Sequence, residues 1–308
     1  MTSDDRLSSL AGALEAAFPD AGAVRPLRVL GEGFSSVAVA TAGGVVFRVG
    51  RIPLAAEGYR RERRLLPWLA PRLPAPVPAP RWHAEPSPAF PHGALGYPLL
   101  PGEPLHPARL AQPDANRIAA DAAAFLAALH AVPGAEAEAA GIEAVEPFEP
   151  RMAGLRDAVL PVLRERLAAD ELGRVARWWD ALLADARMRA YAPAPRHGDF
   201  WYENLLAEGG RLAGVVDWED AALGDPAEDF APLLYLGRDF AERVLAAYHA
   251  RGGRVDGEVR HRAARWWEAQ EFIGIRYSVR HGDREELEDS LRKLRAGPLL
   301  DPRAARFD

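Results

Sequence analysis

The tetrapeptide Arg-His-Gly-Asp occurs twice, beginning at Arg196 and at Arg280. In the first copy, Asp199 is followed by Asn204 and then by Asp217, which ends the apolar run LAGVVD. A loop aspartate can orient a hydroxyl group and accept its proton. Carboxylate and amide oxygens are the hard ligands that Mg²⁺ prefers. This spacing therefore indicates metal-assisted transfer of a group to a hydroxyl oxygen, with Asp199 as the catalytic residue.

The second copy has different surroundings. It leads into DREELEDSLRKL, where Asp283 can cap a helix and Glu286 fits the reciprocal half of a capping box. No pattern of metal ligands follows it. We interpret His281 and Asp283 as structural, with the edge of an acceptor pocket as the alternative.

A glycine-rich loop, GEGFSS, lies between two predicted strands near the N-terminus. Gly31 and Gly33 lack a Cβ atom, so the backbone can approach phosphate oxygens and turn its amides toward them. We assign the rest of the loop, Phe34, Ser35 and Ser36, to the same nucleotide-binding function.

Arg48 lies in the strand that follows a predicted AGG turn. Its guanidinium could reach nucleotide phosphates if an acidic side chain held it in place. Glu62 is the expected partner, because it falls on the inward face of the next predicted helix; Glu57 is the alternative. The ordered set of glycine loop, basic residue, acidic partner and catalytic loop matches the parts needed for phosphoryl transfer from a nucleotide.

The elements that must position these residues change in type along the chain. Strand patterns dominate residues 24–50, and a helix is predicted for 55–69 with Tyr59, Glu62, Leu66 and Leu69 on one face. Two further strands are expected at RWHAE and ALGYPLL. After the Pro/Gly cluster PGEPLHP, helical patterns cover 114–130, 152–189 and 226–295, interrupted by the hairpin NLLAEGGRLAGVVDW.

Composition excludes several kinds of chemistry. The chain has 308 residues, no cysteine and a formal net charge of −6. Disulfides, thiolate zinc sites and a cysteine nucleophile are therefore ruled out. No signal peptide is recognisable, and no apolar stretch approaches the roughly 20 residues of a membrane span. We expect a cytoplasmic protein with neither a nucleic-acid nor a membrane partner; the oligomeric state is left open.

The motifs LGEGFSSVAV, VVFRVG, GYPLLPGEPL, FLAALHAVP, HGDFWYENLL and VVDWEDAALGDPAEDFA, taken together, resemble the signatures of the aminoglycoside phosphotransferase family. The resemblance implies an α+β, bilobal protein-kinase-like fold that uses ATP or GTP with Mg²⁺. It implies that Asn204 and Asp217 hold the metal ion. The linker, with Leu99 and Leu100, would offer backbone hydrogen bonds to the base, and His197 would shape the catalytic loop.

On this resemblance we expect an N-terminal nucleotide-binding lobe at 1–98, a hinge at 99–103 and a mainly helical lobe at 104–308. The helical lobe would carry the catalytic loop and the acceptor site. Asp225 is expected to cap or brace the helix that follows it.

Two positions depart from the family pattern. Arg48 stands where the family usually carries lysine, and a guanidinium is not interchangeable with an ammonium group. Trp201 and Tyr202 replace a common His-Pro-Gly run, and they either line the acceptor site or pack. The two Trp pairs at 178–179 and 266–267 are interpreted as core.

The predicted function is transfer of the γ-phosphate to a hydroxyl of a small, cationic molecule, such as an aminoglycoside, or of a macrolide. A metabolite kinase acting on choline, homoserine or a sugar-like acceptor is the alternative within the same family. Two hypotheses from other functional classes stay open. One is a kinase-fold protein that binds without catalysis, and the other is a metallohydrolase with His197, Asp199 and Asp217 as ligands.

Overall fold

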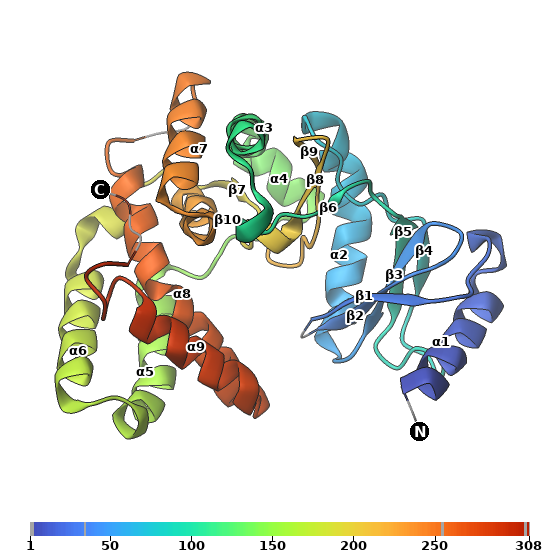
Figure 1. Ribbon diagram of the computed structural model, residues 1–308, viewed down its shortest axis with the longest axis horizontal. Coiled ribbons are helices and arrows are strands. Elements are labelled where there is room, and N and C mark those ends of the chain that lie inside the picture. Colours follow the sequence, from blue (N-terminus) through green and yellow to red (C-terminus); the bar gives the residue numbers. More distant parts are fainter. Residues whose placement is uncertain (1–2, 34, 254–255, 305–306, 308) are drawn as a thin grey trace. The chain divides into compact units, whose positions relative to one another are not determined.

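The structure is a computed structural model that describes residues 3–33, 35–253, 256–304 and 307. The chain divides into two compact units (Figure 1). Unit 1 comprises the chain as far as Glu103 together with Ala139–Gly141 and Leu205–Glu219. Unit 2 comprises Pro104–Glu138, Ile142–Asn204 and the chain from Asp220 onward.

Unit 1 is built on a five-stranded antiparallel sheet in the order β1-β2-β3-β5-β4. A three-stranded sheet has the order β6-β8-β9. The strands are β1 (Arg28–Glu32), β2 (Ser36–Ala40), β3 (Val45–Gly50), β4 (Trp82–Ala84), β5 (Ala94–Pro98), β6 (Glu103–Pro104), β8 (Leu205–Glu208) and β9 (Arg211–Val215).

The first strand begins later than the sequence pattern predicted. It includes Gly31 and starts after Pro26, whereas the expected strand ran from Val24 to Leu30. Proline has no N–H to donate to a ladder, so pairing with β2 starts only beyond it. The β2–β3 turn at Gly44 and the β8–β9 turn at Gly209 were predicted and are confirmed.

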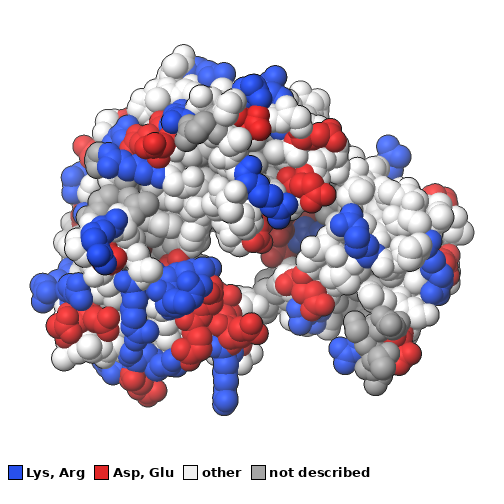
Figure 2. All heavy atoms as spheres, viewed as in Figure 1, with Lys and Arg blue, Asp and Glu red and all other residues white. Residues whose placement is uncertain are grey.

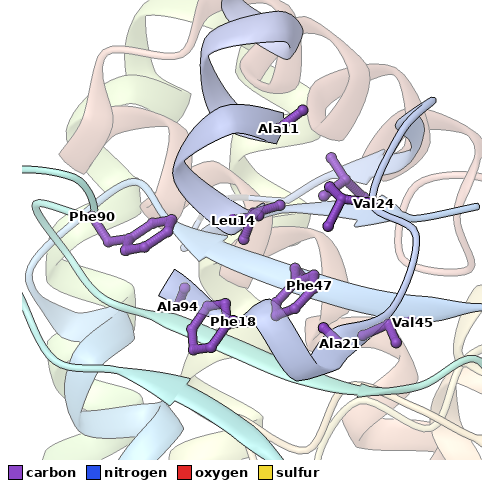
Figure 3. Close-up of a cluster of buried hydrophobic side chains, with 10 residues drawn as sticks. Ala11, Leu14, Phe18, Ala21, Val24, Val45, Phe47, Phe90 and Ala94 are labelled. Atoms are coloured by element: carbon purple, nitrogen blue, oxygen red, sulfur yellow. The ribbon is translucent and has the colours of Figure 1, made fainter. Parts of the chain in front are cut away.

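Helix α1 (Ser3–Ala17) was not predicted, and it contributes to the core of unit 1. Its Leu14 and the following Phe18 pack among buried side chains from the sheet (Figure 3). The rings of Phe18 and Phe47 stack with centroids 5.1 Å apart. This apolar cluster anchors β3, the strand that carries Arg48.

Helix α2 (Leu54–Leu69) confirms the predicted helix. The four residues expected on one face, Tyr59, Glu62, Leu66 and Leu69, are all buried. The periodicity thus located the inward face correctly, including its one carboxylate. Two short 3₁₀ turns, Pro19–Ala21 and Ala70–Arg72, complete the helical part of unit 1.

Unit 2 is mainly helical (Figure 1). Its only described two-stranded sheet pairs β7 (Ala194–Arg196) with β10 (Ala222–Gly224). The helices are α3 (Gln112–Ala131), α4 (Gly134–Ala140, whose last residues belong to unit 1), α5 (Phe148–Arg166), α6 (Ala169–Ala184), α7 (Arg238–Ala250), α8 (Val259–His281) and α9 (Arg284–Ala296), with 3₁₀ segments η3 (Pro107–Arg109), η4 (Ala186–Arg189), η5 (Tyr202–Asn204) and η6 (Pro226–Leu236).

The helix expected over 152–189 is instead two helices and a 3₁₀ turn. Leu167 is extended and ends α5, and the N–H of Ala168 donates to the Glu171 carboxylate at 2.9 Å, which starts α6. The predicted helix at 114–130 is confirmed as α3. Trp178, Trp179 and Trp266 are buried, as expected of core residues, whereas Trp267 is half-buried.

The second Arg-His-Gly-Asp copy ends one helix and begins another. The Asp283 side chain caps α9 by accepting the backbone N–H of Glu286 at 3.0 Å. The predicted structural role of Asp283 is therefore confirmed. Asp225 likewise caps η6 by accepting the N–H of Ala227 at 3.0 Å.

Across the described residues, no single helix has the length and apolar character needed to cross a membrane. Pro113–Ala131 and Gly134–Ala140 meet that criterion only as a pair, and they are bent by 86°.

Candidate active site

The loop that carries Asp199 follows β7 in unit 2. At Gly198 the backbone has φ +88°, and a Cβ atom there would lie 2.3 Å from the carbonyl oxygen of Asp220. Only glycine fits this turn, because the left-handed backbone strains other residues and the neighbouring backbone fills the space. The glycine of the motif therefore has a steric reason, and it sets the direction in which Asp199 leaves the strand.

The carboxylate of Asp229, on η6, binds the backbone of this loop. Oδ2 accepts the N–H of His197 and Oδ1 accepts the N–H of Gly198, both at 2.8 Å. Nε2 of His130, on α3, lies 3.1 Å from Oδ2, and Nδ1 of the same ring lies 2.9 Å from the Tyr248 hydroxyl. Burial raises the pKa of Asp229, but the hydrogen bond and charge of His130 outweigh it and hold that pKa below its ordinary value. The carboxylate is thus kept ionised to accept both backbone bonds.

His197 is fully buried, and its Nδ1 accepts the backbone N–H of Asp199 at 3.2 Å. A ring used in this way shapes the loop. Among the described residues, no group of three or more His, Asp or Glu side chains could hold a metal ion. The contact of His197 with the loop backbone counts against its role as a metal ligand in the metallohydrolase alternative.

Asn204 lies beside Asp199 in unit 2. Its Nδ2 donates to the Asp199 carbonyl at 2.9 Å and to Oδ2 of the Asp199 carboxylate at 2.8 Å. Asn204 is buried and Asp199 half-buried. Because the amide nitrogen is used on Asp199, the amide oxygen is the atom that can meet a cation.

In unit 1, Arg48 and Glu62 form the predicted pair. Nη1 of Arg48 donates to Oε1 of Glu62 at 2.8 Å, with 6% of Arg48 and 1% of Glu62 exposed. Glu57, the alternative partner, is exposed and is not a contact of Arg48. Desolvation lowers the pKa of Arg48, but the carboxylates of Glu62 and Asp217 outweigh it and raise it well above its ordinary value. Burial raises the pKa of Glu62 to about 7, while Arg48 opposes that rise.

Asp217 follows β9 in unit 1 and has φ 63°, a left-handed conformation that is uncommon outside glycine. Its Oδ1 lies 3.1 Å from Nη2 of Arg48, yet this buried oxygen has no hydrogen-bond donor among the described residues. Strained backbone and an unsatisfied buried oxygen are features of functional positions.

Glu219 also contacts Arg48, and sequence reasoning missed it. Its Oε2 accepts from Nη2 of Arg48 at 3.0 Å and from the Ser35 hydroxyl at 2.5 Å. The signal was present in VVDWED, where a second acid stands two residues after Asp217.

The glycine-rich loop closes through backbone bonds. The N–H of Gly33 donates to the Ser36 carbonyl at 2.9 Å, and Nη1 of Arg51 donates to the Gly33 carbonyl at 3.0 Å. A Cβ atom at Gly31 would meet no atom within 4 Å. Gly31 is exposed, so the space beside it is open to solvent. Phe34 lies outside the described residues.

The two serines of the loop and the two leucines of the linker occupy different environments. The Ser36 hydroxyl accepts a hydrogen bond from Nε of Arg48 at 3.4 Å. The Ser35 hydroxyl contacts Glu219, which also binds Arg48. The Leu99 N–H donates to the Gly44 carbonyl at 2.8 Å. Leu100 packs beside Gly214.

Comparisons with known proteins show that the chain belongs to a known enzyme family. The model of the phosphotransferase enzyme family matches residues 26–267. The viomycin phosphotransferase of Streptomyces vinaceus is 32% identical over 203 residues, which span 62% of this chain and 66% of that protein, just under two thirds of its length.

Solved structures share the fold across nearly the whole chain. The macrolide 2'-phosphotransferase MphH of Brachybacterium faecium, solved as the apoenzyme, has a TM-score of 0.69 at 27% identity and covers 96% of this chain and 99% of its own. The GDP and kanamycin complex of APH(2")-IIIa has a TM-score of 0.82 at 23% identity, covering 92% and 96%. The second likeness concerns the fold alone.

Proposed function

Because the chain belongs to the phosphotransferase enzyme family, we propose that it transfers the γ-phosphoryl group of ATP or GTP to a hydroxyl of a small molecule. The observation that carries the proposal is the Asp199–Asn204 pair, a carboxylate held in a loop next to an amide whose oxygen is left for a cation. The viomycin and macrolide relatives support an antibiotic as the acceptor.

In unit 2, Asp199 would orient the acceptor hydroxyl and take its proton. The acceptor oxygen forms a bond to the γ-phosphorus while the bond from that phosphorus to the bridging oxygen breaks, releasing the nucleoside diphosphate. Since the transition state of phosphoryl transfer is loose, orientation supplies most of the catalysis, and the proton can leave late.

In unit 1, Arg48 would neutralise charge on the phosphates while Glu62 keeps its guanidinium in place. The open space at Gly31 would let the loop backbone approach the phosphates. Leu99, through its carbonyl, and Leu100 would contact the base.

The residues also fit a magnesium ion. The unsatisfied Oδ1 of Asp217 and the amide oxygen of Asn204 are hard oxygen donors, as Mg²⁺ requires. When bound with the nucleotide, Mg²⁺ would supply neutralisation of the phosphate oxygens. Three carboxylates, from Glu62, Asp217 and Glu219, surround the single Arg48 guanidinium, so the group has excess negative charge that a cation would balance.

For the acceptor we propose an aromatic platform in unit 2, made by Trp201, Tyr202, Tyr235 and Trp267. Ring centroids are 4.9 Å apart for Trp201 and Tyr202, and 4.7 Å for Tyr235 and Trp267. All four side chains are half-buried. Two of them directly follow the catalytic loop, and such rings offer flat apolar area to an acceptor.

Acidic groups border this platform. The Tyr235 hydroxyl donates to Oε1 of Glu271 at 2.7 Å. On α9, a hollow of about 520 Å³ is lined by Asp283, Glu285, Glu286, Glu288, Asp289 and Arg292. Figure 2 shows acidic side chains gathered, with basic ones among them, over α9. Lys293 Nζ also lies 5.8 Å from the centroid of the Tyr235 ring and pairs with Asp289. The remaining acidic groups favour an acceptor that combines an apolar surface with at least one cationic amine.

The test is a screen with kanamycin, viomycin, a macrolide, choline and homoserine, each with ATP or GTP and Mg²⁺. We expect a product that carries one added phosphoryl group, detected by mass spectrometry, with equimolar release of the diphosphate. Nucleotide binding without any such product would favour the non-catalytic binding protein. Phosphorylation of choline or homoserine alone would favour the metabolite kinase. We place the reaction in the cytoplasm, where ATP and GTP are supplied.

A further inference from the structure

Glu219 joins several parts of unit 1 through few atoms. One carboxylate oxygen, Oε2, accepts from Nη2 of Arg48 at 3.0 Å and from the Ser35 hydroxyl at 2.5 Å. Its backbone carbonyl accepts from Nη2 of Arg61 on α2. The segment after β9 is thereby connected to strand β3, to the glycine-rich loop and to helix α2.

Arg48 uses separate atoms of its guanidinium for these contacts. Nη1 donates to Glu62, Nη2 donates to Glu219, and Nε donates to Ser36 in the loop. A guanidinium is a planar fork whose donors point in fixed directions. A lysine side chain has a single nitrogen, so it cannot donate to Glu62 and Glu219 from two separate positions as Nη1 and Nη2 of Arg48 do.

Glu62 alone contacts only the Nη1 end of the guanidinium, so the Nη2 end needs a second fixed acceptor. Asp217 lies near Nη2, but it is the expected metal ligand. Glu219 therefore is the carboxylate that can keep the guanidinium plane in place while Asp217 serves a cation.

We propose that Glu219 is a positioning residue of the nucleotide site, which orients Arg48 and ties Ser35 of the glycine-rich loop to it. Arg48 is then an adaptation to Glu219 and Ser36, and not a weakened form of the family's lysine. The inference rests on the proposed function, because it concerns residues that would prepare the phosphate-binding part of the site.

A carboxylate near phosphates has two opposite effects on nucleotide affinity. Its charge repels the phosphates, whereas its hydrogen bonds hold Arg48 and the loop in place. Glu219→Ala removes both effects. Glu219→Gln removes the charge and keeps an acceptor oxygen for Arg48 and Ser35. The two substitutions therefore separate positioning from repulsion.

The experiment measures MgADP affinity by isothermal titration calorimetry with the full chain and no acceptor. We expect Glu219→Ala to weaken binding about tenfold and Glu219→Gln to stay within about threefold of the wild type. Glu57→Ala, which removes an exposed carboxylate of the same unit, is the matched control and should leave affinity unchanged. Affinity in Glu219→Ala equal to or tighter than the wild type would overturn the proposal.

Arg48→Lys gives an independent measurement. If Arg48 is adapted to Glu219, the lysine variant binds MgADP more weakly than the wild type. Glu219→Ala should then add little further loss in the double variant, since the coupled contact is already gone. Tighter binding by Arg48→Lys, or fully additive losses, would contradict the inference.

A further variant keeps the test decisive. If Glu219→Ala does not fold, Ser35→Ala and the Arg48→Lys comparison decide the question, with Ser35→Ala expected to weaken MgADP binding about threefold. A wild-type chain that binds no nucleotide would overturn the proposed function itself, and this inference with it, whereas lack of transfer with intact MgADP binding would leave this inference standing.

Discussion

Asp199 reaches its position through contacts on both sides of it along the chain. Gly198 provides a turn that no other residue fits, the buried His197 accepts the Asp199 N–H, and Asn204 donates to its carboxylate. The carboxylate is half-buried. A group oriented in this way can act on a hydroxyl without moving first.

Asp199→Asn is expected to lower kcat by at least about 100-fold, because the amide cannot accept the proton of the acceptor. The affinity for MgADP should change by less than about twofold, since Arg48 and Glu62 are untouched. Steady-state kinetics and calorimetry measure the two effects. Glu165→Gln, at an exposed position of α5, is the control. Transfer that persists in Asp199→Asn would show that another group takes the proton.

At the scale of elements, η6 determines the shape of the catalytic loop. It brings Asp229 beneath the loop, where two backbone N–H groups and a histidine of α3 converge on one fully buried carboxylate. Such a group is costly to remove, because its partners lose their acceptor while they stay away from water.

Asp229→Ala should destabilise the protein by about 3 kcal/mol, with a range of 2–5 kcal/mol. Urea unfolding followed by circular dichroism gives the free energy of unfolding. The folded fraction should also show reduced kcat, and Asp229→Asn should recover part of both quantities, because its one oxygen can accept one of the backbone bonds. A loss of stability below about 0.5 kcal/mol would mean that the loop keeps its shape without this carboxylate.

Helix α8 meets η6 through Glu271 and Tyr235, and this contact makes stability depend on pH. Burial raises the pKa of Glu271 to about 7. The folded protein therefore binds a proton that the unfolded chain releases near pH 4.5. Stability from this group is present below that lower value and is lost as the pH rises through about 7.

Glu271→Gln should flatten this dependence. The free energy of unfolding of the wild type relative to the variant is expected to fall by about 1–3 kcal/mol between pH 5 and pH 8. Urea unfolding of both proteins at the two pH values is the measurement. A difference between the two proteins that stays constant with pH would rule out Glu271 as the titrating group.

At the scale of the whole molecule, the proposed site residues belong to two units. Arg48, Glu62 and Asp217 are in unit 1, whereas Asp199 and Asn204 are in unit 2. Residues 205–219 belong to unit 1, where the Val215 N–H donates to the Pro76 carbonyl at 3.0 Å. The chain therefore passes from unit 2 into unit 1 after Asn204, forms the β8–β9 hairpin there, and returns to unit 2 after Glu219.

Nucleotide binding should stabilise the folded chain as a whole. MgADP at about 100 times its Kd is expected to add about 2.7 kcal/mol, which raises the thermal midpoint. Asp199→Asn should keep this shift and Arg48→Ala should lose most of it. Thermal melts with and without MgADP measure it. An equal shift in Arg48→Ala would show that Arg48 does not contribute to nucleotide binding.

The chemistry of the proposed site was predictable from the sequence because it depends on residue types in a fixed local order. Asp199 and Asn204 are five residues apart, and Glu62 falls on the inward face of α2 by helical periodicity. These relations are set within one loop or one helix, so a linear pattern contains them. The α+β fold followed from the family resemblance, and the local patterns predicted neither α1 nor the break after Leu167.

Only the tertiary structure decided which distant parts of the chain are in contact. Glu219 is 184 residues from Ser35 and 171 from Arg48, and Asp229 is 99 from His130. No local periodicity relates such positions, because their distance in space depends on how strands and helices pack. The sequence by itself therefore determined which side chains are able to do the chemistry. Packing decided which carboxylates hold Arg48 and the loop of Asp199 in place.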